Sequence, residues 1–156
     1  MDISTRLDFA APPSDVFAMM LDKGFQEEVC VASESISYEV SVTDSTTSTS
    51  RTLESPASAA RFTGPSLTVK EDVDWGGASA DGARTGALTM TVLGQPVSLK
   101  GRLRLRPGGR GTTVDLEGEL KVSIPLLGRK LEQSAAPAVM AGFRTQQSVG
   151  DRWLLG

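Results

Sequence analysis

Residues 99–120 read Leu99-Lys-Gly-Arg-Leu-Arg-Leu-Arg-Pro-Gly-Gly-Arg-Gly-Thr-Thr-Val-Asp-Leu-Glu-Gly-Glu-Leu120. On both sides of the glycine-rich turn, apolar and polar residues alternate, which predicts two half-buried strands of one hairpin. Placing Arg106 opposite Thr113 brings basic and acidic residues together on one face: Arg104 with Asp115, Arg102 with Glu117 and Lys100 with Glu119. The other face then pairs Leu105 with Val114, Leu103 with Leu116 and Leu99 with Leu120. Because a slip of one residue would disrupt both faces, this register is predicted for the hairpin.

The first strand of this hairpin carries a stripe of four basic residues: Lys100, Arg102, Arg104 and Arg106. Taken alone, the stripe suggests a binding site for a polyanion. Across the hairpin, however, acidic residues face three of the four. We therefore interpret the stripe as a neutralised charge ladder on a solvated face of the sheet.

The same register sets Gly101 opposite Gly118 on the apolar face. Two facing glycines are expected to leave a hole where side chains would otherwise meet, and to let the sheet bend sharply. The C-terminal region also presents small residues, Ala135, Ala138 and Gly142, in the middle of an apolar helical stripe. Together these features predict an internal cavity, and the alternative is that small residues simply allow close helix-to-sheet packing.

The periodicity of the remaining sequence places the other elements. A strand is predicted at residues 2–9, followed by one short helix that starts at Pro13 and ends or kinks at Gly24, and by a second over about residues 25–33. Residues 56–64 are expected to be irregular. Six further strands are predicted at residues 36–43, 46–53, 67–75, 88–92, 97–105 and 114–124.

After Pro125, apolar residues recur at helical spacing from Leu127 to Trp153, which predicts one long amphipathic helix. Pro137 lies inside it and is expected to bend the helix or to mark a break, because it lacks an amide donor and its ring clashes with the preceding turn. The pattern predicts an α+β fold over residues 1–156, as a single domain. A curved antiparallel sheet of about seven strands wraps around the long C-terminal helix, with two short helices after the first strand.

Composition excludes several classes of function. The chain of 156 residues has no histidine and one cysteine, Cys30. Catalytic triads that need histidine, nearly every zinc site and an internal disulfide are therefore ruled out. The formal net charge of -3 argues against general binding of nucleic acid. No apolar run approaches the ~20 residues of a membrane helix and residues 1–9 lack a signal-peptide core, so we expect a cytoplasmic protein without stable membrane insertion, metal or cofactor.

Five stretches of the sequence resemble a known bacterial family: Phe9-Ala-Ala-Pro-Pro-Ser-Asp-Val-Phe-Ala-Met-Met20, Ser66-Leu-Thr-Val-Lys-Glu71, Thr85-Gly-Ala-Leu-Thr-Met90, Val97-Ser-Leu-Lys-Gly-Arg-Leu-Arg-Leu105 and Val122-Ser-Ile-Pro-Leu-Leu-Gly-Arg-Lys-Leu-Glu132. With the element order, they make the chain similar to the START/Bet v 1-like (SRPBCC) superfamily and, more narrowly, to its DUF2505 family. The resemblance implies a helix-grip fold with a deep apolar cavity. Members of the superfamily include carriers of lipids, sterols or polyketides as well as cyclases, hydrolases and dehydratases, whereas DUF2505 supplies no catalytic motif.

Two charged residues have the inward parity of the predicted sheet. Glu71 lies between Val69 and Val73, and Arg51 shares its parity with Leu53. A cross-strand pair of Arg51 and Glu71 lining the cavity would orient the polar end of a ligand. The alternatives are a slip or bulge that puts Arg51 in solvent, or a wetted and inert Glu71 at the cavity mouth.

The only tyrosine, Tyr38, also has inward parity and could bind a ligand carbonyl, although an ordinary core tyrosine is the alternative. Flexible methionines such as Met90 would suit an adaptable apolar wall. The residues expected to line the cavity are Tyr38, Val40, Arg51, Glu71, Met90, Leu103, Leu116, Gly118, Ala138 and Gly142.

The sequence therefore predicts binding or carriage of a hydrophobic small molecule between the sheet and the C-terminal helix. One alternative is an enzyme of polyketide cyclase or dehydratase type that uses Glu71, Arg51 or Tyr38 in the same cavity. Another is a module that binds a protein partner and no ligand. A cavity that is filled, or smaller than the ~300 Å³ typical of ligand sites, would favour this last alternative.

Overall fold

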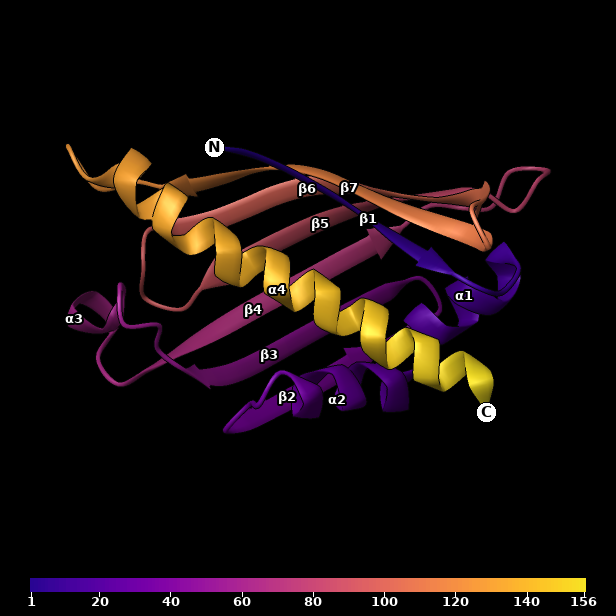
Figure 1. Cartoon of the computed structure of the whole chain (residues 1–156), viewed down its shortest axis with the longest axis horizontal. Coiled ribbons are helices and arrows are strands. Elements are labelled where there is room, and N and C mark those ends of the chain that lie inside the picture. Colours follow the sequence, from indigo (N-terminus) through magenta and orange to yellow (C-terminus); the bar gives the residue numbers. More distant parts are fainter.

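The alternating stretches of the sequence form strands and the helical stretches form helices in the computed structural model, which describes residues 1–156 (Figure 1). Along the chain the elements are β1 (Asp2–Phe9), α1 (Pro13–Met20), α2 (Lys23–Ala32), β2 (Ser37–Val42), β3 (Thr46–Glu54), α3 (Ala60–Thr63), β4 (Ser66–Trp75), β5 (Arg84–Val92), β6 (Val97–Gly108), β7 (Gly111–Val122) and α4 (Gly128–Leu155).

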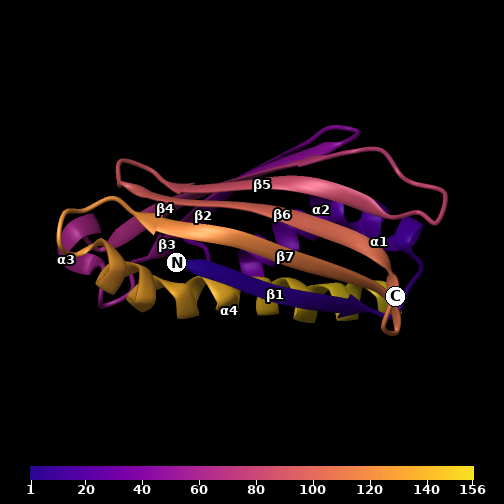
Figure 2. The ribbon, with the colours of Figure 1, turned by 90° about the horizontal axis from the view of Figure 1, so that it is seen from above.

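All seven strands belong to one antiparallel sheet with the order β1-β7-β6-β5-β4-β3-β2. Since β1 and β2 lie at opposite edges, the segment with α1 and α2 carries the chain from one edge of the sheet to the other. Helix α4 runs across one face of the curved sheet, as the two perpendicular views show (Figures 1 and 2). The predicted helix-grip architecture is confirmed.

The register predicted for the glycine-rich hairpin is also confirmed. Every expected pair is present between β6 and β7, from Leu99 opposite Leu120 to Arg106 opposite Thr113. On the outer face, Asp115 forms ion pairs with Arg6, opposite it on β1, at 2.6 Å and with Arg106 at 3.0 Å, but none with Arg104, opposite it on β6. Asp115 is thus shared between the strands on both sides of β7.

The facing glycines of this hairpin do not leave a hole, and that expectation is wrong. A Cβ at Gly101 would lie 2.8 Å from the Glu117 carbonyl oxygen, and one at Gly118 would lie 2.8 Å from the Lys100 carbonyl oxygen. A leucine side chain from the opposite strand also approaches each position, at 3.1 and 3.2 Å. The two backbones are therefore too close for any side chain, and neighbouring leucines fill the remaining space.

Two helices differ from the sequence-based expectation. Helix α2 begins at Lys23, because the Asp22 Oδ1 atom accepts a hydrogen bond from the Phe25 N–H at 3.2 Å and caps the helix. Gly24 consequently lies in the first turn of α2 and does not end α1. The segment expected to be irregular contains the single helical turn α3.

Helix α4 runs without interruption from Gly128 to Leu155, so the expectation that Pro137 marks a break is wrong. Proline removes the amide that would bind the Gln133 carbonyl oxygen. Both residues are exposed, so water can replace the missing donor. This solvent access explains how the helix continues through the proline.

Two polar side chains attach α4 to the sheet. Near its start, the Glu132 Oε2 atom accepts a hydrogen bond from the Val122 N–H of β7 at 3.0 Å. Towards its end, Gln147 accepts a hydrogen bond from the Asp8 N–H and donates one to the Asp8 carbonyl oxygen, each at 2.7 Å. These two anchors, Glu132 and Gln147, hold the helix on both sides of the segment that crosses the middle of the sheet.

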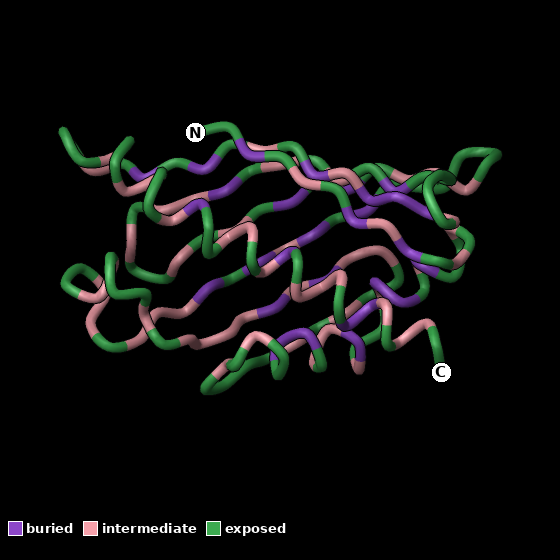
Figure 3. Tube along the Cα trace, in the orientation of Figure 1, coloured by how far each residue is buried: buried purple, intermediate pink, exposed green.

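The core is concentrated in the half of the molecule that carries α1, α2 and the end of α4. Its most deeply buried side chains are fully shielded from solvent: Phe9, Val16, Phe25, Leu105 and Val149. Toward α3, residues of intermediate exposure become more frequent along the strands (Figure 3). The sheet and the first half of α4 therefore pack less tightly against each other than the rest of the molecule does.

Candidate ligand-binding cavity

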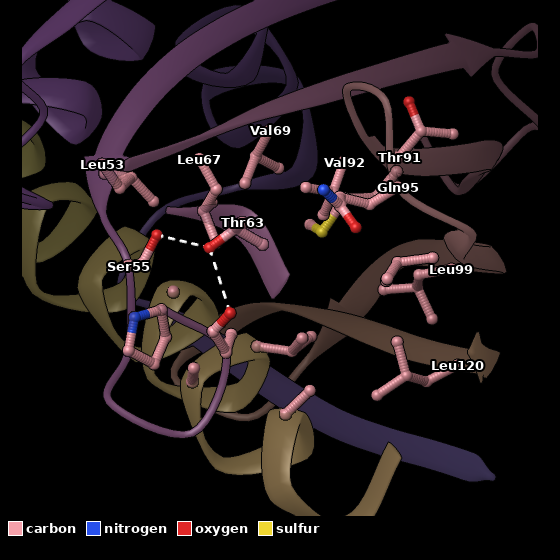
Figure 4. Close-up of a pocket in the computed structure, with 18 of the residues that line it drawn as sticks. Leu53, Ser55, Thr63, Leu67, Val69, Thr91, Val92, Gln95, Leu99 and Leu120 are labelled. Carbon is pink, nitrogen blue, oxygen red and sulfur yellow. Dashed lines mark hydrogen bonds between the residues drawn. The ribbon is translucent and has the colours of Figure 1, made fainter. Parts of the chain in front are cut away.

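A cavity of about 490 Å³ lies between the sheet and the first half of α4. Aliphatic side chains from neighbouring strands surround it: Leu53, Leu67, Val69, Val92, Leu99 and Leu120 (Figure 4). Helix α4 closes the opposite side with Leu131, Ala135, Ala138, Val139 and Gly142. Both the volume and the mainly apolar wall are typical of sites for small molecules.

The strand register explains how this wall is formed. Arg51, Val69 and Val92 lie opposite one another across β3, β4 and β5. Glu71 and Met90 belong to the next row, two residues along each strand. Because residues two apart point to the same face of a strand, both rows face α4.

Glu71 and Phe143 form the inner end of the cavity. Both side chains also line a second void, of about 30 Å³, on their other side. That space is comparable to the volume of one water molecule. Val73, which also lines this void, and its neighbour Leu88 belong to the packed core. The cavity therefore ends at the middle of the sheet and extends from there toward α3.

The outer end of the cavity is bordered by the loop that contains α3. The hydroxyl groups of Ser55 and Thr63 are hydrogen-bonded at 2.7 Å (Figure 4). The Gln95 side-chain amide donates to the Phe62 carbonyl oxygen at 3.2 Å, and Phe62 itself is 37% exposed. No residue of α3 is buried, so this border is the part of the wall that opens most easily.

The ion pair expected between β3 and β4 is present inside the cavity. The Arg51 NH1 atom lies 3.5 Å from the Glu71 Oε2 atom, and the two side chains are only 11% and 10% exposed. This distance is longer than the ~2.7–2.9 Å of a strong charge-assisted hydrogen bond. The Arg51 Nε atom and the Thr49 hydroxyl, opposite Glu71, are buried and have no hydrogen-bond partner. The protein therefore leaves the Arg51 Nε–H group and the Thr49 hydroxyl without hydrogen-bond partners.

Burial raises the pKa of the Glu71 carboxyl, and the nearby Arg51 guanidinium opposes this effect without cancelling it. Burial likewise raises the pKa of the Cys30 thiol, which makes its nucleophilic thiolate form less accessible. No three acidic or cysteine side chains are grouped closely enough to hold a metal ion. The site therefore offers the Arg51 guanidinium, the buried Glu71 carboxyl with its raised pKa, two further carboxyls at Glu34 and Glu54, and a large apolar surface.

Five of the ten residues expected to line the cavity do so: Arg51, Glu71, Met90, Ala138 and Gly142. They come from β3, β4, β5 and α4, which are separated along the chain and brought together by the sheet and its covering helix. The alternative that Arg51 lies in bulk solvent is wrong, because the register of β3 continues through it without a bulge.

The other five residues lie elsewhere. Tyr38 and Val40 have the predicted parity, opposite Arg51 and Thr49, but β2 is the edge strand, neither residue reaches the cavity, and Tyr38 is 38% exposed. Three more positions lie farther along their strands, beyond Glu71: Leu103 and Leu116 line the small void, and Gly118 lies in the closely packed hairpin.

Several cavity residues were not anticipated from the sequence. Phe143 of α4 is buried and lines the cavity beside Gly142, so the inner face of the helix carries a large side chain as well as small ones. Val92 and Leu99 could have been found, because the strand register places them in the same two rows as Arg51 and Glu71. The residues of the α3 loop that line the cavity could not be predicted, because they show neither helical nor strand periodicity.

Comparison with known families identifies the chain. Residues 4–154 match the family described as Protein of unknown function (DUF2505). The chain belongs to the DUF2505 family. The match covers nearly all of the sequence and confirms the resemblance noted above. No curated protein sequence matches this DUF2505 chain.

Several solved structures have the same fold as this DUF2505 protein. TTHA0849 from Thermus thermophilus has a TM-score of 0.62 at 18% identity, with 96% of this chain and 97% of that chain covered. Ms6760 from Mycobacterium smegmatis has a TM-score of 0.62 at 12% identity, with 99% and 90% covered. A STAR-related lipid transfer protein from Xanthomonas axonopodis has a TM-score of 0.56 at 17% identity, with 94% and 82% covered. The TM-scores establish a common fold, and at such low sequence identities they establish the fold alone.

A separate observation concerns membranes. None of the four helices combines the length and the apolar character needed to cross a bilayer.

Proposed function

We propose that this DUF2505 protein binds a hydrophobic small molecule in the cavity between the sheet and α4. The observation that carries the proposal is a space of about 490 Å³ with a mainly aliphatic wall. Leaving such a surface without a partner is unfavourable, because burial of each CH₂ group of a ligand contributes about 0.8 kcal/mol. The fold shared with a STAR-related lipid transfer protein is consistent with this role.

The size of the cavity argues against the partner-module alternative. A domain that uses this fold only to bind another protein has no need for internal space, and its core would be filled. Here the space exceeds the ~300 Å³ lower limit of ligand sites, and it lies between the sheet and α4 instead of on an outer surface.

Gly142 offers a direct test, because it faces the open part of the cavity. A Cβ at this position would have one neighbour within 4 Å, the Arg51 NH2 atom at 3.9 Å. Gly142→Leu should therefore place its branched side chain in the ligand space while improving helix propensity. We expect the affinity of this variant for a neutral dye that fluoresces in apolar surroundings to fall about tenfold or more. Fluorescence titration would measure this change.

Gly142→Ala is the matched control. It gives the same gain in helix propensity, about 1 kcal/mol relative to glycine, but fills little of the cavity. We expect normal dye binding and raised thermal stability in this variant. If Gly142→Leu remains folded by circular dichroism and still binds the dye as the unmodified protein does, the cavity is not the binding site.

A further inference from the structure

The Arg51 guanidinium group is an unusual occupant of an apolar cavity. It keeps its positive charge at any physiological pH. Its single ionic partner, the Glu71 carboxylate, is 3.5 Å away, and its Nε–H group has no hydrogen-bond partner. Its NH2 atom lies near the backbone of α4 at Gly142, where no side chain is available to accept a hydrogen bond. The guanidinium group therefore retains donors that a ligand can use.

Arg51 is the only basic residue that lines the cavity, which also has three glutamates in its wall: Glu71 beside Arg51, and Glu34 and Glu54 from the segments that follow α2 and end β3. Glu71 approaches it from β4, Cys30 of α2 is electrostatically coupled to both residues, and Tyr38 lies opposite it on β2. Helix α4 contributes Gly142 and Gln146 to the cavity, and both are uncharged. Glu71 is the single ionic partner of Arg51, so protonation of Glu71 leaves the guanidinium without an ion pair.

We propose that the ligand of this cavity is an amphiphile with one carboxylate head, such as a fatty acid. Its head binds the Arg51 guanidinium, and its aliphatic chain extends along the wall toward α3. The inference rests on the proposed function and specifies the class of ligand that the cavity selects.

The shape of the cavity supports this orientation. A carboxylate presents two oxygen atoms in one plane, which matches the paired N–H donors of an arginine. From Arg51 toward α3, aliphatic side chains such as Leu53, Leu67 and Val92 make up much of the wall, and polar residues, among them Glu54, join them near α3. A neutral sterol or alcohol would leave Arg51 with only its long contact to Glu71, whereas a ligand with two charged ends would place the second one among the apolar side chains of the wall.

Glu71 makes binding of the acid dependent on a proton. If Glu71 is ionised, a bound carboxylate brings a second negative charge close to the first, and only one arginine compensates for both. If Glu71 is protonated, its hydroxyl can donate a hydrogen bond to the ligand carboxylate. Binding of a carboxylate should therefore be accompanied by protonation of Glu71, and it should weaken as the pH rises.

The test compares three probes with the same chain: dodecanoate, dodecanol and methyl dodecanoate. Each displaces a neutral, polarity-sensitive dye from the full-length protein at pH 7. We expect dodecanoate to bind about tenfold to a hundredfold more tightly than either neutral probe, which is the range for a hydrogen bond to a charged group. Arg51→Met should remove this preference. Glu71→Gln, which imitates the protonated carboxyl, should strengthen binding of dodecanoate and leave dodecanol unchanged.

The double variant Arg51→Met with Glu71→Gln is a control for destabilisation, because it removes both charges and leaves neither one buried without its partner. It should bind the dye and all three probes without preference for the acid. If dodecanol and dodecanoate displace the dye equally well from the unmodified protein, the carboxylate inference is overturned and the proposed cavity function remains. If neither the dye nor any probe binds, the proposed function itself is overturned.

Discussion

Glu71 connects the stability of this protein to pH through a single buried carboxyl. Burial raises its pKa above the ordinary value, so the folded state binds this proton more tightly than the unfolded chain does. The free energy of unfolding should therefore fall as the pH rises from the ordinary carboxyl value through the raised one. Acidification within this window is stabilising at Glu71, in contrast to a carboxylate held by a strong ion pair.

Glu71→Gln should remove this dependence, because glutamine has no proton to lose. We expect the variant to become more stable than the unmodified protein as the pH rises through that window, and the difference to level off above it. Urea unfolding at a series of pH values between 4 and 8 would measure this. A variant that is less stable at every pH would mean that the ionised pair stabilises the fold.

Helix α4 combines an apolar face that closes the cavity with a proline on its exposed side. Pro137 removes one hydrogen bond from a helix that nevertheless continues through it. Its cost is therefore local, and it is partly offset because proline restricts the unfolded chain. The small residues on the inner side of α4, Ala138 and Gly142, keep the helix from filling the space beneath it.

Pro137→Ala should stabilise the protein by about 1–3 kcal/mol, since alanine restores the amide and has the highest helix propensity. Thermal and urea unfolding would measure the gain. Ala141→Pro, one turn later and also exposed, is the reverse control and should destabilise by about 3 kcal/mol or more. If both substitutions changed the free energy of unfolding by the same amount and in the same direction, the description of α4 as a regular helix through residue 137 would be contradicted.

At the scale of the whole molecule, the two halves of the fold are built differently. The half with α1, α2 and the end of α4 contains most of the fully buried side chains, whereas the half with α3 surrounds the cavity. Regions with few buried apolar contacts open more readily than the packed core. A ligand in the cavity would supply the missing contacts in the second half only.

Hydrogen exchange should reveal this division. In the absence of ligand, we expect the slowest amide exchange in β1, β6 and β7 near α1, and faster exchange around α3 and the first turns of α4. A saturating apolar ligand should slow exchange in this second region and leave the first unchanged. Uniform exchange across both halves, measured by mass spectrometry of peptides, would contradict the picture.

Some features of this structure can be predicted from the sequence and others cannot, and the difference has physical reasons. The β6–β7 register was predictable because both faces of the hairpin specify it independently, by charge and by apolar pairing. The supposed hole at Gly101 and Gly118 was not, because the absence of a side chain says nothing about how closely two backbones approach. Parity placed Tyr38 on the correct face, but it cannot tell that β2 is the edge strand, whose side chains do not line the cavity.

The same reasoning applies to the cavity. Arg51 and Glu71 were found by parity alone, because a charged residue in an inward position is a strong departure from an apolar pattern. Phe143 was missed, since an apolar residue on a helix fits several rotations of the helix equally well. The α3 border depends on loop conformation, for which neither helical nor strand periodicity exists.

The two anchors of α4 have a consequence for how the protein can be changed. Glu132 and Gln147 do not line the cavity, and they hold the sheet through the backbone of Val122 and Asp8. Substitutions in the wall therefore leave the attachment of the helix intact. A protein engineer can therefore redesign the interior by altering wall residues alone while keeping the frame.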